Sequence, residues 1–277
     1  MKYSFISTSQ GGRIPEFSSF LSSLENNSLD NELFEIIFVD QTNDEYDELL
    51  RNYSINIVHI KSDKLPLSKA RNIALSKASG EFVFFSDDDA DYSRFDFVTL
   101  EKKLNSNNIV SFPITIAPEG NRPYGGRKFP TVEKYVSAFE LFSICLSLSV
   151  VIRRELVETV GCFDEMFGAG AKYGGSEETD LLLKLFINGD KPLYSPELNV
   201  MHPLEYADID YDKQCHKFYN YAIGYSKICK RHSSKLNYIP YIELSRVMSR
   251  TLLAMIVKKE KRFYWYKLKG FMNGIFK

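Results

Sequence analysis

Three consecutive carboxylates, Asp87, Asp88 and Asp89, follow the apolar run Phe82 to Phe85 and a serine. Carboxylates this close repel one another, so a strand that delivers them to one point calls for a compensating charge. Hard cations such as Mg²⁺ and Mn²⁺ favour oxygen ligands and can join a carboxylate to a diphosphate. The segment therefore predicts a divalent-cation site, and the alternative is an acidic turn at a strand end.

A second candidate is Arg71, at the start of the helical segment that leads into this strand. A guanidinium can bind two phosphate oxygens at once and cannot lose its charge. Arg71 is therefore a candidate phosphate ligand. The alternative is a solvated arginine on a helix face.

A third candidate is the segment in which Gly174 and Gly175 precede Glu177 and Glu178 at the start of a predicted helix. Glycine lets a backbone or a sugar ring approach closely. The positive end of a helix dipole stabilises ionised carboxylates. These residues are candidates for binding and proton transfer, and the alternative is ordinary helix capping.

The elements that must position these residues begin with five strand-like runs, at residues 3–8, 34–40, 55–61, 81–86 and 109–115. Helical spacing of apolar residues predicts helices at 16–24 and 67–79, and Gly80 is expected to end the second. Repeated βαβ units imply a mainly parallel sheet that is covered on both faces. We therefore expect an α/β fold.

Ligands of such sheets bind at the carboxyl ends of the strands. Polar residues stand at these positions after three of the runs: Thr8 after the first, Asp40 and Gln41 after the second, and the acidic triplet after the fourth. The three sets are expected to share one crevice.

The second half of the chain alternates loops with shorter elements. Residues 116–129 are rich in Gly and Pro and predict an irregular loop that could cover a site. A strand is expected at 146–152, a helix at 153–160 closed by Gly161, and a helix at 177–187 closed by Gly189. After Pro203 the pattern is helical to the end.

Taken together, these segments resemble the glycosyltransferase family 2 enzymes with the GT-A fold, over nearly the whole chain. KARNIALSKASGEFVFFSDDDAD resembles the family's Ala-Arg-Asn helix, Gly-Glu strand and Asp-x-Asp metal motif. VVIRRELVETVGCFDEMFG and GGSEETDLLLKL resemble its acceptor-side half. The resemblance implies a nucleotide-diphospho-sugar transferase fold with a Rossmann-like, mainly parallel central sheet flanked by helices.

The resemblance also implies a division of the chain. Residues 1–115 would be the nucleotide-sugar-binding half of the GT-A domain, 116–205 the acceptor-binding half, and 206–277 a basic helical C-terminal extension.

Carried over residue by residue, the resemblance implies a metal site, a donor site and an acceptor site. Mn²⁺ or Mg²⁺ would be held by Asp87, Asp89 and His202. The nucleotide-sugar donor would contact Thr8, Asp40, Gln41, Arg71, Asp87 and Asp88. The acceptor would contact Gly175 and Glu177. The alternative for His202 is an ordinary half-buried histidine at a strand end.

We expect a single in-line displacement with inversion, in which Glu178 removes the proton of the acceptor hydroxyl. The metal and Arg71 would neutralise the departing diphosphate. Two positions differ from the family pattern: Gln41 stands where many relatives have a second acid, and Glu178 where most have Asp.

Composition narrows the class of protein. The first residues lack the apolar stretch of a signal peptide, and no run approaches the roughly 20 apolar residues that span a bilayer, so we expect a cytoplasmic protein. Four cysteines without a CxxC pair argue against a zinc site and a disulfide framework.

Charge is unevenly spread along the chain. Residues 226–277 contain 13 Lys and Arg against two acids, a net charge of +11, and the rest of the chain carries 22 basic and 34 acidic residues, or −12. The apolar run 251–257, followed by cations and aromatics, suits an anionic membrane surface, which a lipid-linked saccharide acceptor would make useful. The alternative is a packing helix with a solvated basic face.

Other classes compete with this interpretation. An aspartate-based phosphotransferase also places Asp-x-Asp after an apolar strand, but it has Thr or Val where this chain has Asp91. A non-catalytic nucleotide-sugar-binding protein would keep the fold without turnover. Nucleic acid is not expected as a partner because most of the chain is acidic. For the transferase, UDP-sugars come first as donors and dTDP-sugars second, with surface polysaccharide or glycan assembly as the expected process.

Overall fold

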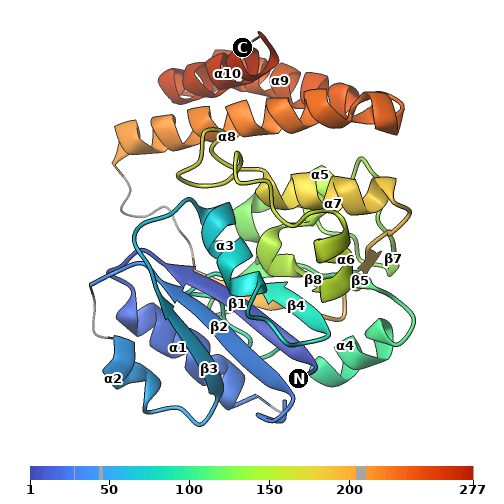
Figure 1. Cartoon of the computed structure of the whole chain (residues 1–277). Helices are drawn as coiled ribbons and strands as arrows, with labels where there is room; N and C mark the ends of the chain where they lie inside the picture. The colour runs from blue at the N-terminus through green and yellow to red at the C-terminus, as the bar shows by residue number, and fades with distance from the viewer. Residues whose placement is uncertain (28, 44–45, 204–209, 277) are drawn as a thin grey trace.

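A computed structural model describes residues 1–27, 29–43, 46–203 and 210–276 (Figure 1). The strands are β1 (Tyr3–Ser9), β2 (Phe34–Asp40), β3 (Asn56–Lys61), β4 (Phe82–Phe85), β5 (Ile109–Ser111), β6 (Ile114–Ile116), β7 (Lys134–Tyr135), β8 (Val150–Arg153), β9 (Leu193–Tyr194) and β10 (Val200–His202). The α-helices are α1 (Ile14–Glu25), α2 (Tyr46–Leu50), α3 (Leu67–Leu75), α4 (Phe97–Leu104), α5 (Leu141–Ile144), α6 (Arg154–Thr159), α7 (Glu177–Ile187), α8 (Tyr211–His232), α9 (Ile239–Val257) and α10 (Lys261–Phe276).

The central sheet has the strand order β3-β2-β1-β4-β8-β5-β9-β7, and β6 pairs with β10 in a small second sheet. β1 to β4 run parallel to their neighbours, as the repeated βαβ units predict. Beyond β4 the sheet is mixed because β8 runs antiparallel to both β4 and β5. Parallel pairing returns between β5 and β9 and between β6 and β10, so the sheet is mainly parallel, as predicted, with antiparallel pairs at β8 and β7.

Two hydrophobic clusters cover the two faces of the sheet. Phe5 and Phe84 stack 4.4 Å apart, between ring centroids, in the cluster that contains the buried residues of α1 and α4. Their chain neighbours Ile6 and Val83 point to the opposite face, where α3 and α7 pack. Successive side chains of a strand alternate between faces, so a sheet buried on both sides reads as a continuous apolar run.

Three predicted boundaries are wrong. α3 ends at Leu75 rather than at residue 79, and a Cβ on Gly80 would lie 2.6 Å from the backbone nitrogen of Ser4. Gly80 therefore permits close approach to β1 instead of ending the helix. The run at 109–115 divides into β5 and β6 around Pro113, which has no N–H to donate. The strand expected from residue 146 begins only at 150, after a 3₁₀ turn.

Other boundaries agree with the prediction. α7 spans residues 177–187, and both Gly161 and Gly189 adopt positive φ directly after their helices. The chain is helical from α8 onward, and these three helices lie together above the sheet domain (Figure 1). The predicted division after residue 115 falls within β6, and the one after residue 205 lies outside the described residues.

All four cysteines carry free thiols, and only Cys162 among them is partly exposed. In the part of the chain that the structure describes, no helix combines the length and the hydrophobicity needed to cross a bilayer.

Candidate active site

A cavity of about 1260 Å³ opens at the carboxyl ends of β1 and β4 and extends to the C-terminal helices. Most of the predicted site residues line it: Thr8, Arg71, Asp87, Asp88, Asp89, Gly175, Glu177, Glu178 and His202. The loop after β6 contributes Tyr124 to Lys128, so the expected covering loop does border the cavity. The tertiary structure thus brings the candidate residues of both halves of the chain to one place.

Asp87, Asp89 and His202 form a compact group, with one ligand atom of each within 4.8 Å of the others. His202 Nε2 lies 3.0 Å from Asp89 Oδ1 and 3.6 Å from Asp87 Oδ2. Paired backbone bonds between Asp91 and Met201 tie the segment after β4 to β10 and so place the histidine beside the carboxylates.

The chemistry of this group fits a divalent cation. Asp89 Oδ1 is buried and accepts no hydrogen bond of normal geometry. His202 Nδ1 can donate to the Pro203 carbonyl at 2.8 Å, which leaves the Nε2 lone pair facing the carboxylates, as in metal-binding histidines. Burial lowers the pKa of His202, but Asp87 and Asp89 outweigh it and raise that pKa to about 10. A divalent cation would displace that proton.

Arg13 is a site residue that the sequence analysis missed. It follows Gly11 and Gly12 at the end of β1, and its guanidinium reaches Asp88 Oδ1 at 2.8 Å and Asp89 Oδ2 at 2.6 Å. Burial raises the pKa of Asp88 to about 6, against the effect of Arg13. The signal was present, since a cation in the loop after a parallel strand lies where such sheets bind ligands.

Arg71 is almost fully buried and joins the two predicted carboxylate groups. Its NH1 lies 3.0 Å from Glu177 Oε1, and its NH2 lies 3.6 Å from Asp87 Oδ1. NH2 also donates to Ser147 Oγ at 3.2 Å. The residue predicted as a phosphate ligand therefore links the start of α7 to the acidic triplet.

Glu178 is the second residue of α7 and lines the cavity beside Glu177. Burial, and after it the repulsion from Glu177, raises the pKa of Glu178 well above its usual range. Ser176, the residue before α7, is held at φ 70°, a left-handed conformation that costs a non-glycine residue energy. A carboxylate with a raised pKa at a strained helix start has the properties of a general base.

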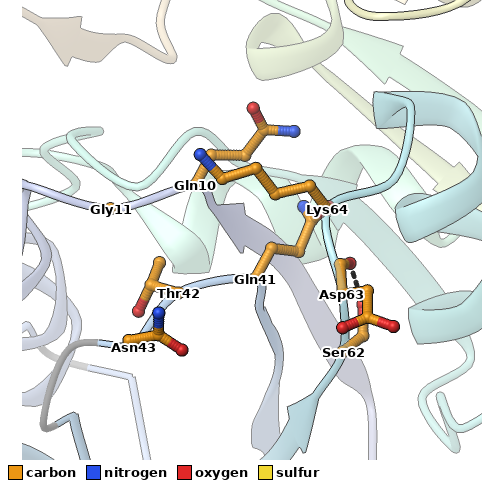
Figure 2. Close-up of a pocket in the computed structure, with 8 residues that line it drawn as sticks. All are labelled: Gln10, Gly11, Gln41, Thr42, Asn43, Ser62, Asp63 and Lys64. Carbon is orange, nitrogen blue, oxygen red and sulfur yellow. Dashed lines mark hydrogen bonds between the residues drawn. The ribbon is translucent and has the colours of Figure 1, made fainter.

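A smaller pocket of about 340 Å³ lies where β1, β2 and β3 end (Figure 2). It is lined by Gln10, Gly11, Gln41, Thr42, Asn43, Ser62, Asp63 and Lys64. Gln41 Oε1 accepts from the Leu65 backbone at 2.6 Å, which orients its amide. Asp40 is buried and does not line this pocket; it accepts from the backbone of Thr42 and lies 3.0 Å from His59 Nε2.

The sequence model of glycosyl transferase family 2 matches residues 15–161, more than half of the chain. The chain belongs to this family. This glycosyltransferase is therefore an enzyme of the predicted class, and neither the aspartate-based phosphotransferase nor the non-catalytic alternative is supported.

Solved structures share the fold. A crystal structure of S. aureus TarS 1-349 has a TM-score of 0.64 at 18% identity, covering 99% of this chain and 81% of that one. The same TarS fragment in complex with UDP-GlcNAc gives 0.61 at 16% identity, with 98% and 91% covered. The mannosyltransferase PcManGT from Pyrobaculum calidifontis, in complex with GDP-Man and Mn²⁺, gives 0.64 at 14%, with 99% and 85% covered. No curated protein sequence matches significantly. The predicted GT-A fold is confirmed.

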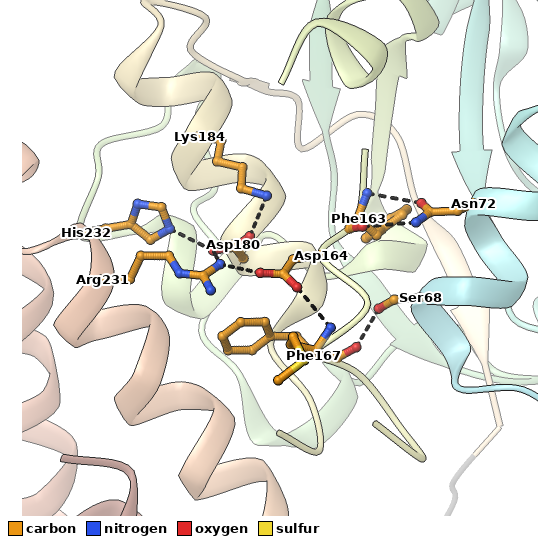
Figure 3. A network of polar contacts seen from close by, with 10 residues as sticks. Ser68, Asn72, Phe163, Asp164, Phe167, Asp180, Lys184, Arg231 and His232 are labelled. Carbon is orange, nitrogen blue, oxygen red and sulfur yellow. Dashed lines mark hydrogen bonds and ion pairs between the residues drawn. The ribbon is translucent and has the colours of Figure 1, made fainter. Parts of the chain in front are cut away.

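A polar network holds the start of α7 in this glycosyltransferase (Figure 3). Asp180 is fully buried and lies 2.7 Å from His232 Nε2, 3.1 Å from Arg231 and 2.8 Å from Lys184. Arg231 also binds Asp164 at 2.7 Å. Because His232 and Arg231 belong to α8, this network fixes α7, and with it Glu178, against the C-terminal helices.

Close packing of the backbone before α7 also holds this helix against α8. A Cβ on Gly174 would lie 2.7 Å from Cβ of Asn220, and one on Gly175, at φ 124°, would lie 2.9 Å from the ring of Tyr221. The glycines predicted for substrate approach thus also let the loop before α7 pack against α8. The acceptor role of Gly175 stays a prediction.

Proposed function

We propose that this glycosyltransferase transfers a sugar from a nucleoside diphosphate donor to a hydroxyl of a saccharide or lipid-linked saccharide, with inversion. One observation carries the proposal: a half-buried carboxylate with a raised pKa, Glu178, shares a cavity with the candidate metal-binding group Asp87, Asp89 and His202. A UDP-sugar is the first choice of donor and a dTDP-sugar the second, in the assembly of surface polysaccharide or glycans.

The donor is proposed to span the two pockets. Its nucleoside would lie in the pocket beside Gln41, with Asp40 holding the loop that carries Thr42. The diphosphate would lie near Thr8, which lines the larger cavity. Complexes of the structural neighbours with UDP-GlcNAc and with GDP-Man and Mn²⁺ support a donor of this class.

Mn²⁺ or Mg²⁺, held by Asp87, Asp89 and His202, would neutralise charge on the departing diphosphate. Arg71 holds Glu177, at the start of α7, close to the metal-binding carboxylates through its ion pairs with Glu177 and Asp87. Glu178 accepts the proton of the acceptor hydroxyl while the oxygen of that hydroxyl forms a bond to the anomeric carbon of the donor sugar. The bond from that carbon to the diphosphate oxygen breaks, and its electron pair leaves with the nucleotide.

Replacing Glu178 with Gln tests the proposal. Removing the base should lower the rate of transfer by about 10²- to 10⁴-fold and leave the affinity for nucleoside diphosphate and Mn²⁺ unchanged. Donor affinity is measured by calorimetry and turnover by nucleoside diphosphate release. Glu155→Gln, on the exposed surface of α6, is the matched control. Transfer at the normal rate by Glu178→Gln would contradict the role of this residue.

The division into donor half, acceptor half and helical extension is part of the proposal, as is a cytoplasmic enzyme that touches the inner face of an anionic membrane. α9 exposes Leu253, Ile256 and Val257, and exposed Lys258 and Lys259 follow directly. Apolar side chains beside cations favour binding to anionic bilayers. Flotation with phosphatidylglycerol vesicles should recover the protein, and replacing Leu253 and Ile256 by Ser should abolish recovery. Absence of binding by the unmodified protein would favour a packing role for these helices.

A further inference from the structure

Two polar side chains of α3, Ser68 and Asn72, bind the loop that precedes α7. They are four residues apart, so they lie on the same face of the helix. Both contact residues 163–170, which we name the connecting segment (Figure 3). Neither is among the described residues that line the large cavity, so their contacts are with protein rather than with substrate.

Asn72 binds the backbone of Phe163 in both directions. Its Nδ2 donates to the Phe163 carbonyl at 3.0 Å, and its Oδ1 accepts from the Phe163 N–H at 3.1 Å. An amide side chain carries a donor and an acceptor side by side, which matches the two groups of one residue's backbone. The start of the connecting segment is therefore fixed to α3 by a pair of bonds that neither Ala nor Asp reproduces.

Ser68 fixes the other end of the segment. It is fully buried and donates to the Phe167 carbonyl at 2.6 Å. Gly168 follows at φ 103°, and a Cβ there would lie 2.8 Å from Ser68 Oγ and 3.4 Å from the carboxylate carbon of Glu177. The connecting segment thus touches both α3 and the first residue of α7.

The connecting segment also reaches α7 through α8. Asp164 pairs with Arg231 at 2.7 Å, and Arg231 lies 3.1 Å from Asp180 of α7. The Arg231 guanidinium lies 4.7 Å from the ring centroid of Phe167. The segment therefore joins the helix that carries Arg71 to the helix that carries the proposed base.

This second connection limits how α7 can move. The ion pair between Arg71 and Glu177 links α3 and α7 at one point, which allows rotation about that point, whereas the connecting segment adds contacts at separate points. Glu178 must come within about 2.6–3.2 Å of the hydroxyl whose proton it accepts. A displacement of about 1 Å, even from a remote substitution, can lower the rate by about 10²-fold.

We propose that Ser68 and Asn72 are positioning residues, which hold Glu178 in place for proton transfer through the connecting segment. They set the position of the base relative to the metal-binding group without contact with donor or acceptor. This inference rests on the proposed role of Glu178.

Asn72→Ala removes both bonds to Phe163. It should lower kcat by about tenfold to 10²-fold and leave the KM for the donor unchanged, because the donor is assigned to residues at the ends of the strands and on Arg71. Hydrolysis of UDP-glucose and dTDP-glucose supplies kcat, since water takes the place of the acceptor hydroxyl and needs the same base. Ser68→Ala should act in the same direction.

Asn107→Ala is the matched control. Asn107 also donates to a backbone carbonyl, that of Lys103 at 2.8 Å, and accepts from the Tyr135 hydroxyl at 3.1 Å, but it is not among the described residues of the cavity wall. Its loss should affect stability and leave kcat normal.

Asn72→Asp separates hydrogen bonding from shape. It keeps the size of the side chain but turns a carboxylate oxygen toward the Phe163 carbonyl and toward Glu165, which Asn72 meets at 3.3 Å. This variant should be at least as slow as Asn72→Ala. A role in packing alone predicts a normal kcat for it.

Hydrogen exchange measures the position of α7 without a substrate. In Asn72→Ala, amides of the connecting segment and of α7 should exchange at least about tenfold faster, the effect of losing two hydrogen bonds, while those of β1 and β2 exchange normally. Asn107→Ala should leave exchange in α7 unchanged.

A normal kcat in Asn72→Ala, unchanged exchange in its α7, or an equal loss of kcat in Asn107→Ala would each overturn the inference. If Glu178→Gln reacts at the normal rate while Asn72→Ala is slow and its α7 exchanges faster, the proposed base is wrong and the positioning of α7 stands. If the unmodified protein hydrolyses neither donor, the proposed donor class fails, and exchange in α7 alone decides the inference.

Discussion

Asp180→Asn should destabilise this glycosyltransferase and weaken the hold of α8 on α7. Its partners on α8, together with Lys184, lower the pKa of the fully buried Asp180 from 3.8 to about 2, although burial alone would raise it. At 1.36 kcal/mol per pKa unit, the ionised carboxylate contributes about 2 kcal/mol to the free energy of unfolding at pH 7. The variant also removes the carboxylate that pairs with Arg231 and Lys184, so the expected loss is about 2 to 4 kcal/mol.

The pH dependence makes this prediction specific. Because the folded-state pKa is depressed, the contribution is fully present above the unfolded-state pKa and is lost as pH falls through the folded-state pKa. About half of it should be gone by pH 3. Urea denaturation of both proteins between pH 7 and pH 3 should therefore show a gap that narrows as pH falls.

Asp212→Asn is the matched control for Asp180→Asn. Asp212 forms a 2.7 Å ion pair with Arg262, but both side chains are more than half exposed, so its loss should leave stability unchanged. The reasoning is refuted if Asp180→Asn is as stable as the unmodified protein at pH 7, or if its deficit is the same at pH 3.

Three further predictions follow from the site and the sheet. His202→Gln should weaken Mn²⁺ binding, followed by electron paramagnetic resonance, by at least about tenfold; unchanged affinity would remove His202 from the metal site. Because the pKa of Glu178 is raised by burial and then by Glu177, kcat/KM should fall on acidification well above pH 4.5, and Glu177→Gln should shift this fall to lower pH; a flat profile would exclude Glu178 as the base. Gly80→Ala should cost about 1–3 kcal/mol in urea denaturation because its Cβ meets Ser4, and an unchanged midpoint would show that β1 can shift.

The sequence predicts the bounds of a helix or strand best where those bounds depend on neighbouring residues. The run 34–40 and the helix 177–187 coincide with β2 and α7 because β-branched runs, apolar spacing and glycine ends are all read from neighbouring residues. Disagreement appears where a distant contact decides. Gly80 owes its role to Ser4, on a strand more than seventy residues earlier.

Some residues of the candidate site could likewise be identified from local sequence, and others only from contacts between distant segments. The acidic triplet could be identified from the sequence because its members are consecutive and follow an apolar run, so its chemistry is local. Arg13 belongs to no motif that the sequence analysis used, and it reaches Asp88 and Asp89 only because β1 pairs with β4. His202 reaches the triplet through the bonds between Asp91 and Met201.

The sequence by itself determined the parallel half of the sheet, the acidic corner and the carboxylates at the start of α7, since each depends on residue types at short spacing. The tertiary structure decided how the basic C-terminal helices meet this corner. Their packing on α7, through Asp180 and the close approach at Gly174, depends on shape and charge matching between segments far apart in the chain. No local pattern contains that information, and so only the folded chain reveals it.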